Sequence, residues 1–251
     1  MTAFRKSLQI CSISLCSAGL LSTPVLASEA VQWDYGKERG PDQWAVLDNA
    51  YQACGNGKNQ SPVNLQNSLE TDLPALTFNY QPGAEKVFNN GHTVEADYMP
   101  GSQLTLNGNS YTLRQFHFHS PSENTLNGQD FPMEAHLVHS DKNGNLAVVA
   151  VMFEVGATNP VLSQIWQQPL TAGEISEMEA AVNATGLLPA PKDYFRYNGS
   201  LTTPPCTEGV RWLVMKQPMT LSQQQLSSFQ GMLSGPNNRP VQPLNARQIL
   251  K

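Results

Sequence analysis

The feature that most restricts the fold of this 251-residue chain is a series of short segments with the residue pattern of β-strands. Alternation of apolar and polar residues with a period of two is typical of strands that turn one face toward a core. Asn107-Gly108 and Asn143-Gly144 separate neighbouring segments and are strong signals for tight hairpin turns. The predicted strands cover residues 76–81, 86–98, 103–106, 111–119, 134–140 and 147–155.

Helical patterns are few. Residues 160–167 fit one short helix. A capping box is predicted at residues 222–225, and Leu226, Phe229 and Leu233 follow it on one helix face. No repeat, low-complexity tract or shift in composition marks a domain boundary. The sequence therefore predicts one sheet-dominated domain with short peripheral helices.

The N-terminus has the layout of a secretory signal peptide. Two basic residues precede an apolar run over 8–21, and small residues stand at positions −3 and −1 of a cut before Ser28. We therefore expect a leader over 1–27 and a domain over 28–251 that is exported to the periplasm, with secretion into the medium as the alternative. No later stretch has the roughly 20 apolar residues of a membrane helix, so no membrane contact is predicted.

Removal of the leader leaves two cysteines, Cys54 and Cys206. In an exported protein two cysteines most simply form one disulfide, and two free buried thiols are the alternative. The net charge of −5 is modest and no basic cluster is present. Nucleic acid is therefore not a predicted partner.

Four of the five histidines lie in two short runs, QFHFH at 115–119 and EAHLVH at 134–139. Because side chains alternate along a strand, His117 and His119 share one face, and the phenylalanines between and before them occupy the other. By the same rule His136 lies on the face opposite to His139. We therefore predict a metal site of His117, His119 and His136, and an ordinary structural role for His139.

A polar residue stands two positions before the first histidine of each run and shares a face with that histidine. A metal-bound imidazole usually donates its second N–H to a carboxylate or amide oxygen. Gln115 is placed to accept from His117, and Glu134 is placed to accept from His136. Both residues are therefore predicted to be outer partners of the metal ligands.

Three neutral histidines leave a fourth coordination position open, which is the pattern of a catalytic zinc site. A structural zinc normally has four protein ligands, and copper, iron or cobalt would also accept an all-nitrogen set. The alternative for the whole cluster is a polar sheet face that is lined by histidines and holds no metal.

At this point the sequence resembles the α-class carbonic anhydrases, in particular their exported bacterial branch. The resemblance covers nearly all of the chain after the leader. Its motifs are WDYGKERGPDQW (33–44), GKNQSPVNL (57–65), NNGHTVE (89–95), QFHFHSPSENT (115–125), PMEAHLVH (132–139), LAVVAVMFEVG (146–156), YNGSLTTPPCTEGVRW (197–212) and NNRPVQPLNARQ (237–248).

The resemblance implies a mainly β (α+β) fold with a large, central, twisted and predominantly antiparallel sheet. It also implies one Zn²⁺ per chain on His117, His119 and His136, and reversible hydration of CO2 to bicarbonate by zinc-bound hydroxide. In such enzymes Thr202 would accept a hydrogen bond from the hydroxide and donate its own proton to Glu123, which orients the nucleophile.

Other roles are implied by the same resemblance. His92, in NNGH, matches the proton shuttle, because a free imidazole titrates near 6.5 and both takes up and releases protons at neutral pH. Tyr35 matches a residue of the solvent network that leads to the shuttle. Cys54 and Cys206 fall where exported members form their disulfide, and members of this branch often pair into homodimers. The residues that match the substrate pocket are Val138, Val148, Leu201, Thr203, Val210 and Trp212.

Two rival functions fit parts of the sequence. The spacing His117-x-His119-x3-Glu123 also matches the first metal motif of cupins, in which Glu123 would be a fourth ligand to iron or manganese. An exported zinc-holding or ligand-binding protein on the same scaffold, without enzymatic activity, is the second rival.

Overall fold

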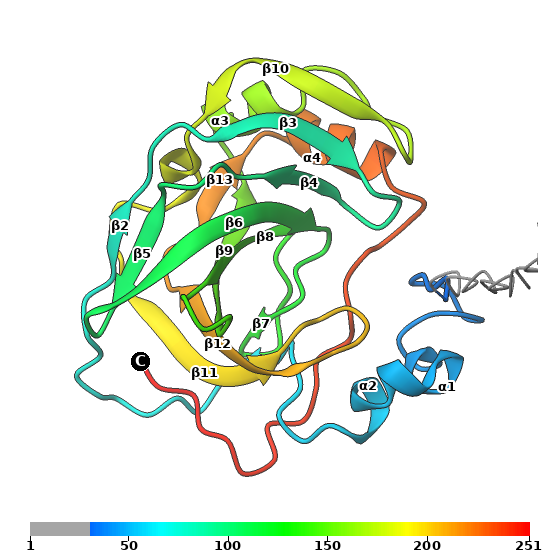
Figure 1. The fold of residues 1–251 in the computed structure, drawn as a ribbon, viewed down its shortest axis with the longest axis vertical. Helices are drawn as coiled ribbons and strands as arrows, with labels where there is room; N and C mark the ends of the chain where they lie inside the picture. The colour runs from blue at the N-terminus through cyan, green and yellow to red at the C-terminus, as the bar shows by residue number, and fades with distance from the viewer. Residues whose placement is uncertain (1–30) are drawn as a thin grey trace, which may run out of the picture. The chain divides into compact units, whose positions relative to one another are not determined.

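One large mixed sheet of eleven strands dominates residues 31–251, the part of the chain that this computed structural model describes (Figure 1). A separate two-stranded parallel sheet joins β1 to β7. The strands are β1 (Asn64–Leu65), β2 (Thr77–Asn79), β3 (Ala84–Asn89), β4 (Val94–Asp97), β5 (Gln103–Leu106), β6 (Asn109–His119), β7 (Thr125–Leu126), β8 (Met133–Ser140), β9 (Leu146–Val155), β10 (Ile175–Val182), β11 (Tyr194–Ser200), β12 (Glu208–Met215) and β13 (Met219–Leu221).

The main path of the sheet runs β10-β3-β4-β6-β8-β9-β12-β11, with β13 beside β9 and with β5 joining β2 to β6. Only the β9–β12 and β9–β13 pairs of this sheet are parallel; the others are antiparallel. The expected fold class, a predominantly antiparallel sheet with short helices around it, is confirmed.

The helices are short and lie outside the sheet, as Figure 1 shows for α3 and α4. They are α1 (Trp44–Leu47), η1 (Asn49–Tyr51), α2 (Ala53–Asn56), α3 (Pro160–Ile165), η2 (Ala184–Leu187) and α4 (Gln223–Gly231). The predicted capping box opens α4: the Ser222 hydroxyl accepts from the Gln225 N–H at 3.1 Å, and the Gln225 side chain accepts from the Ser222 N–H at 3.0 Å. No helix within residues 31–251 combines the length and apolarity that crossing a membrane requires.

One predicted strand is wrong in its extent. The segment 86–98 is interrupted, because β3 ends at Asn89 and β4 begins at Val94. Between them the Asn90 side chain accepts hydrogen bonds from the backbone N–H groups of His92 and Thr93, at 2.9 and 2.8 Å. This side-chain-capped turn competes with the strand, and it places His92 at a bend instead of inside the ladder.

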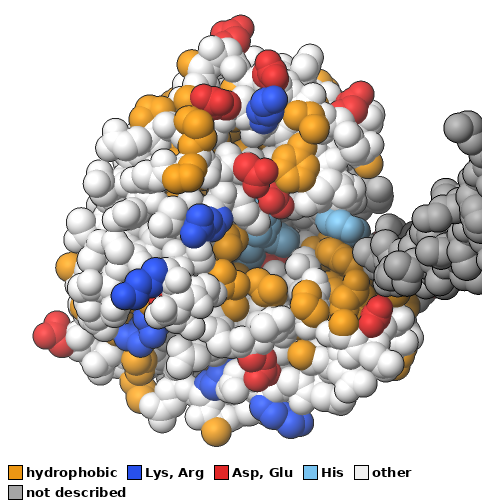
Figure 2. Space-filling model, in the orientation of Figure 1, with side chains coloured by type: hydrophobic (Ala, Val, Ile, Leu, Met, Phe, Trp, Pro, Cys, Tyr) orange, Lys and Arg blue, Asp and Glu red, His pale blue; other side chains and the backbone are white. Residues whose placement is uncertain are grey.

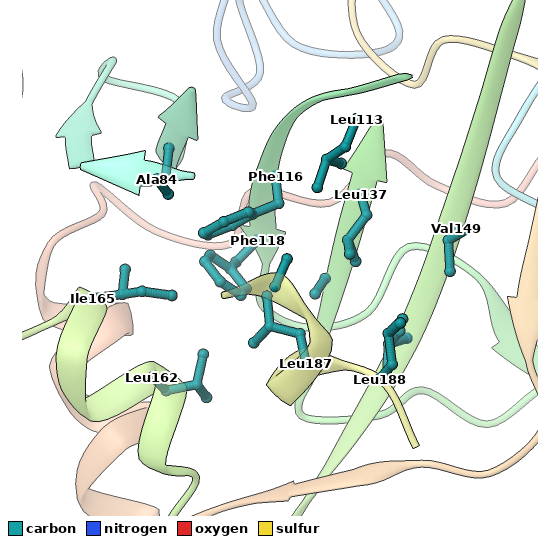
Figure 3. Close-up of a cluster of buried hydrophobic side chains, with 14 of the residues drawn as sticks. Ala84, Leu113, Phe116, Phe118, Leu137, Val149, Leu162, Ile165, Leu187 and Leu188 are labelled. Atoms are coloured by element: carbon teal, nitrogen blue, oxygen red, sulfur yellow. The ribbon is translucent and has the colours of Figure 1, made fainter. Parts of the chain in front are cut away.

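The pleat of β6 builds the main hydrophobic core. Phe116 and Phe118 are fully buried on the face opposite to the histidines. They point toward Ile165 of α3 and Leu187 of η2, with Leu137 of β8 beside them (Figure 3). The other face of β9 and β12 carries a second apolar cluster. A single alternating strand thus separates a packed core from the polar face that holds the candidate site.

Cys54 and Cys206 form a disulfide, so the alternative of two free thiols is wrong. The bridge packs with Trp44 in a third, small apolar cluster and ties α2 to the loop after β11. Residues 31–251 form one compact unit. The leader predicted over 1–27 lies outside the described residues.

His139 has the structural role that its position predicted. It is fully buried; its Nδ1 donates to the Ala147 carbonyl oxygen at 3.3 Å, and its Nε2 accepts from the Tyr80 hydroxyl at 2.6 Å. Burial lowers its pKa from 6.5 to about 4, and the hydrogen bond to Ala147 opposes this shift. His139 is therefore neutral in the folded protein at neutral pH.

This shift predicts a loss of stability in acid. The unfolded chain takes up the His139 proton near pH 6.5 and the folded chain only near pH 4, so the free energy of unfolding should fall across this window, by up to about 3 kcal/mol. Denaturant unfolding of the wild type and of His139→Gln between pH 4 and 8 measures the effect. The variant should lose this part of the pH dependence; parallel curves for the two proteins would contradict it.

Candidate metal centre

Strands β6 and β8 bring three imidazoles together. The two strands are antiparallel neighbours, and their register sets His117 directly opposite His136. His119 lies two positions further along β6 on the same face. One nitrogen from each of His117, His119 and His136 lies within 4.8 Å of the other two. The alternation rule therefore predicted correctly which histidines meet.

The outer nitrogens of two imidazoles bind the partners that the sequence predicted. His117 Nδ1 lies 2.8 Å from Gln115 Oε1, and His136 Nε2 lies 3.0 Å from Glu134 Oε1. Each of these oxygens accepts, so each imidazole donates on its outer side. The inward nitrogens, Nε2 of His117 and Nδ1 of His136, then carry free lone pairs.

The outer partner of His119 was not predicted from the sequence. Its Nδ1 donates to the backbone carbonyl of Asn237 at 2.7 Å. The Asn237 side chain also donates to the carbonyls of His92 and Phe118 and accepts from the Ser120 N–H. The motif that carries the resemblance includes Asn237, but no local spacing connects it to a histidine 118 positions earlier.

The environment of the three imidazoles fits a metal ion. Burial lowers the pKa of each, and repulsion between neighbouring imidazoles adds to the effect on His117 and His136. All three are therefore neutral, which is the form that binds a metal. His119 Nε2 is buried and has no hydrogen-bond partner among the described residues. An unpaired buried acceptor that faces two others is the donor set that a divalent cation would satisfy.

Glu123 lies beside this cluster, with its Oε2 3.9 Å from His136 Nδ1, and is not one of the three converging ligands. Its Oε1 accepts from the Arg239 backbone N–H at 2.9 Å, and the carboxylate is absent from the group of converging ligand atoms. Burial raises the pKa of Glu123 to about 8, while the Arg239 N–H and the Thr202 hydroxyl oppose the shift. The cupin alternative, with Glu123 as a fourth ligand, is not supported by this geometry.

An apolar wall lies beside the cluster. Figure 2 shows histidine side chains in a hollow of this face, with hydrophobic side chains along its rim. The edge of His136 contacts the Trp212 ring, with ring centroids 4.8 Å apart. Thr203 is partly exposed in the loop after β11. Five of the six predicted pocket residues belong to the second apolar cluster: Val138, Val148, Leu201, Val210 and Trp212.

His92 is linked to His119 through Asn237, which donates to the His92 carbonyl and accepts from the His119 ring. The His92 ring stacks on Trp33 with centroids 3.8 Å apart and planes 6° apart. Partial burial lowers its pKa, and the nearby Asp34 carboxylate opposes this. A cavity of about 490 Å³ borders His92, Asp34 and Tyr35. Trp33 was missed as a contact of His92, because two residues 59 positions apart in loops leave no periodic signal.

Comparisons with known proteins agree with this geometry. Residues 39–251 match the family model of the eukaryotic-type carbonic anhydrases. A carbonic anhydrase of Neisseria gonorrhoeae is 48% identical over 221 residues, which cover 87% of this chain and 87% of that protein. A carbonic anhydrase of Pectobacterium carotovorum is 43% identical over 225 residues, covering 89% and 92%. The solved α-carbonic anhydrase of Thermovibrio ammonificans, in complex with the inhibitor sulfanilamide, has a TM-score of 0.86 at 44% identity and covers 89% of this chain and 100% of that chain.

The family match includes both histidine-bearing strands and extends to the last residue. The resemblance drawn from the sequence motifs is confirmed, as is the expectation of an enzyme of the carbonic anhydrase class. Fold, imidazole cluster and relatives agree, and the chain belongs to the eukaryotic-type carbonic anhydrase family.

Proposed function

We propose that the chain catalyses the reversible hydration of CO2 to bicarbonate and a proton, at one zinc ion held by His117, His119 and His136. The observation that carries the proposal is the convergence of three neutral imidazoles whose outer N–H groups are all engaged. When bound there, zinc supplies the Lewis acidity that makes water nucleophilic at neutral pH, with a water pKa of about 7 in carbonic anhydrases.

Thr202 and Glu123 orient the attacking water in this proposal. Thr202 is buried beside Glu123, and its hydroxyl, as a hydrogen-bond donor, opposes the rise in the pKa of that carboxyl. The charge of a bound zinc would favour the ionised carboxylate further. A hydroxyl that gives its proton to a carboxylate presents only lone pairs on its other side. The Thr202 oxygen therefore accepts from the water, and this fixes the direction from which the water approaches the substrate.

The apolar wall binds the substrate. Carbon dioxide has no charge and no hydrogen to donate, so a surface made of Val138, Val148 and Trp212 receives it without leaving polar groups unpaired. Leu201 and Val210 continue this wall, and Thr203 lies at its mouth.

His92 carries the released proton to solvent. Its imidazole is half-buried and lies against the cavity that it shares with Asp34 and Tyr35. Partial burial keeps the pKa below 6.5, so the ring gives up its proton readily to the medium. In this proposal Tyr35 belongs to the solvent path that leads from the zinc site to His92.

Export is part of the same proposal. We infer that residues 1–27 are a signal peptide and that the domain over 28–251 acts in the periplasm, with secretion as the alternative. The disulfide between Cys54 and Cys206 supports an oxidising compartment. Pairing into homodimers stays a prediction of the resemblance.

The activity is tested by stopped-flow CO2 hydration together with metal analysis of the same sample. The zinc-loaded chain should hydrate CO2 far faster than buffer and contain one zinc per chain. Zinc-loaded protein that hydrates CO2 no faster than buffer would exclude the enzymatic function and favour a zinc-holding protein.

His136→Ala should remove both zinc and CO2 hydration, because it deletes one of three ligands and breaks the chain of hydrogen bonds from Glu134. The matched control is His139→Gln, on the same strand but on the other face, which should keep zinc and activity at neutral pH. Retention of stoichiometric zinc by His136→Ala would show that the metal lies elsewhere.

His92→Ala should slow turnover by about 10-fold or more in weakly buffered solution, because the proton then leaves without an imidazole. Imidazole added at high concentration should restore the rate, and kcat/KM should change little, since proton release follows attack on CO2. Rates that do not recover with imidazole would exclude His92 as the shuttle.

A further inference from the structure

The hydrogen bonds behind His136 extend past Glu134 to a second buried residue, Asn124. Glu134 Oε2 accepts from the backbone N–H groups of Glu123 and Asn124, at 2.7 and 2.8 Å. Its Oε1 accepts from the Asn124 side-chain Nδ2 at 2.7 Å and faces His136 Nε2 at 3.0 Å. The Asn124 amide is therefore the side-chain group that shares this oxygen with the imidazole.

The orientation of the Asn124 amide is fixed on its far side. Its Oδ1 accepts from the Val63 backbone N–H at 3.1 Å and from the Tyr197 hydroxyl at 2.8 Å. A backbone N–H can only donate, so Oδ1 and not Nδ2 must face Val63. With Oδ1 held there, Nδ2 has to point at Glu134 and act as a donor.

The donor and acceptor roles in this series of hydrogen bonds determine which nitrogen of the His136 imidazole donates. Because Asn124 donates to Glu134 Oε1 and two backbone N–H groups donate to Oε2, the carboxylate accepts at both oxygens. His136 Nε2 then has to donate to it, which leaves Nδ1 with the lone pair on the side of His117 and His119.

Tyr197 is also linked to the imidazole by a second route, through Trp212. Its ring stacks on Trp212 with planes 7° apart, and Trp212 contacts His136 edge-on. The close fit depends on Gly199, where a Cβ would lie 2.9 Å from both rings and 2.0 Å from the Ser61 hydroxyl. Tyr197 thus closes a ring of contacts through Asn124, Glu134, His136 and Trp212.

We infer that Tyr197 and Asn124 are positioning residues that fix the tautomer and the orientation of His136 as a zinc ligand. Neither residue touches the converging nitrogens: Asn124 acts through Glu134, and Tyr197 acts through Asn124 and Trp212. The inference rests on the proposed function, because it concerns how tightly and in what geometry the ligand set holds zinc.

The test uses two variants that change one hydrogen-bonding group each. Tyr197→Phe removes the hydroxyl and keeps the ring on Trp212. Asn124→Asp keeps the size of the side chain and the acceptor for Val63, but replaces the donor to Glu134 with an oxygen. The measurements are the rate of zinc dissociation into a chromophoric chelator and the visible absorption spectrum of the cobalt-substituted protein.

Zinc should dissociate about 10- to 100-fold faster from Asn124→Asp, the range for loss of an outer partner of a metal ligand. Tyr197→Phe should give a smaller rise of about 3- to 10-fold, because Val63 still holds the amide. Both cobalt spectra should change in band position or intensity, since the His136 ring is less fixed.

The matched control is Tyr80→Phe, which removes another buried hydroxyl that is bonded to a histidine of β8, here His139. It should lower the melting temperature about as much as Tyr197→Phe, yet leave zinc dissociation and the cobalt spectrum unchanged. If zinc dissociates at the same rate from Tyr197→Phe, Tyr80→Phe and a zinc-loaded, active wild type, the inference is wrong, while the proposed function is unaffected. A wild type that binds no zinc would overturn the proposed function as well. If Asn124→Asp does not fold, Tyr197→Phe decides.

Discussion

The candidate site depends on one constraint: each imidazole must donate a hydrogen bond from its outer N–H, so that its inner nitrogen carries a lone pair. Three different acceptors meet this demand, a side-chain amide for His117, a backbone carbonyl for His119 and a carboxylate for His136. A backbone carbonyl can never donate, so the partner of His119 has no alternative state. The nitrogens converge because these acceptors hold their rings from behind.

The sheet makes this arrangement compatible with a stable fold. Along β6, alternate residues belong to two environments, with Phe116 and Phe118 in the core and His117 and His119 facing the site. The aromatic side chains anchor the strand through burial, while the neighbouring β8 fixes the register that places His136 opposite His117. A slip of one residue would exchange the two faces and place imidazoles in the core.

Local periodicity predicted the parts of the site that lie within a few residues of one another. The facing histidines, Gln115 and Glu134 follow from the pleat alone. Asn237 and Trp33 do not, because contacts across 118 and 59 positions depend on how the chain closes. The roles of Thr202 and His92 came from the resemblance. The break after Asn89 was missed although the sequence carries a signal for it: Asn90-Gly91 is the same turn dipeptide as Asn107-Gly108, and the Asn90 side chain accepts from the N–H groups of the turn.

The carbonyl that holds His119 belongs to Asn237, near the C-terminal end of the chain. During synthesis this acceptor is made 118 positions after His119. An incomplete polypeptide therefore has its imidazoles without the brace that directs one of them. A polypeptide that stops before Asn237 would therefore lack the group that orients one of the three ligands.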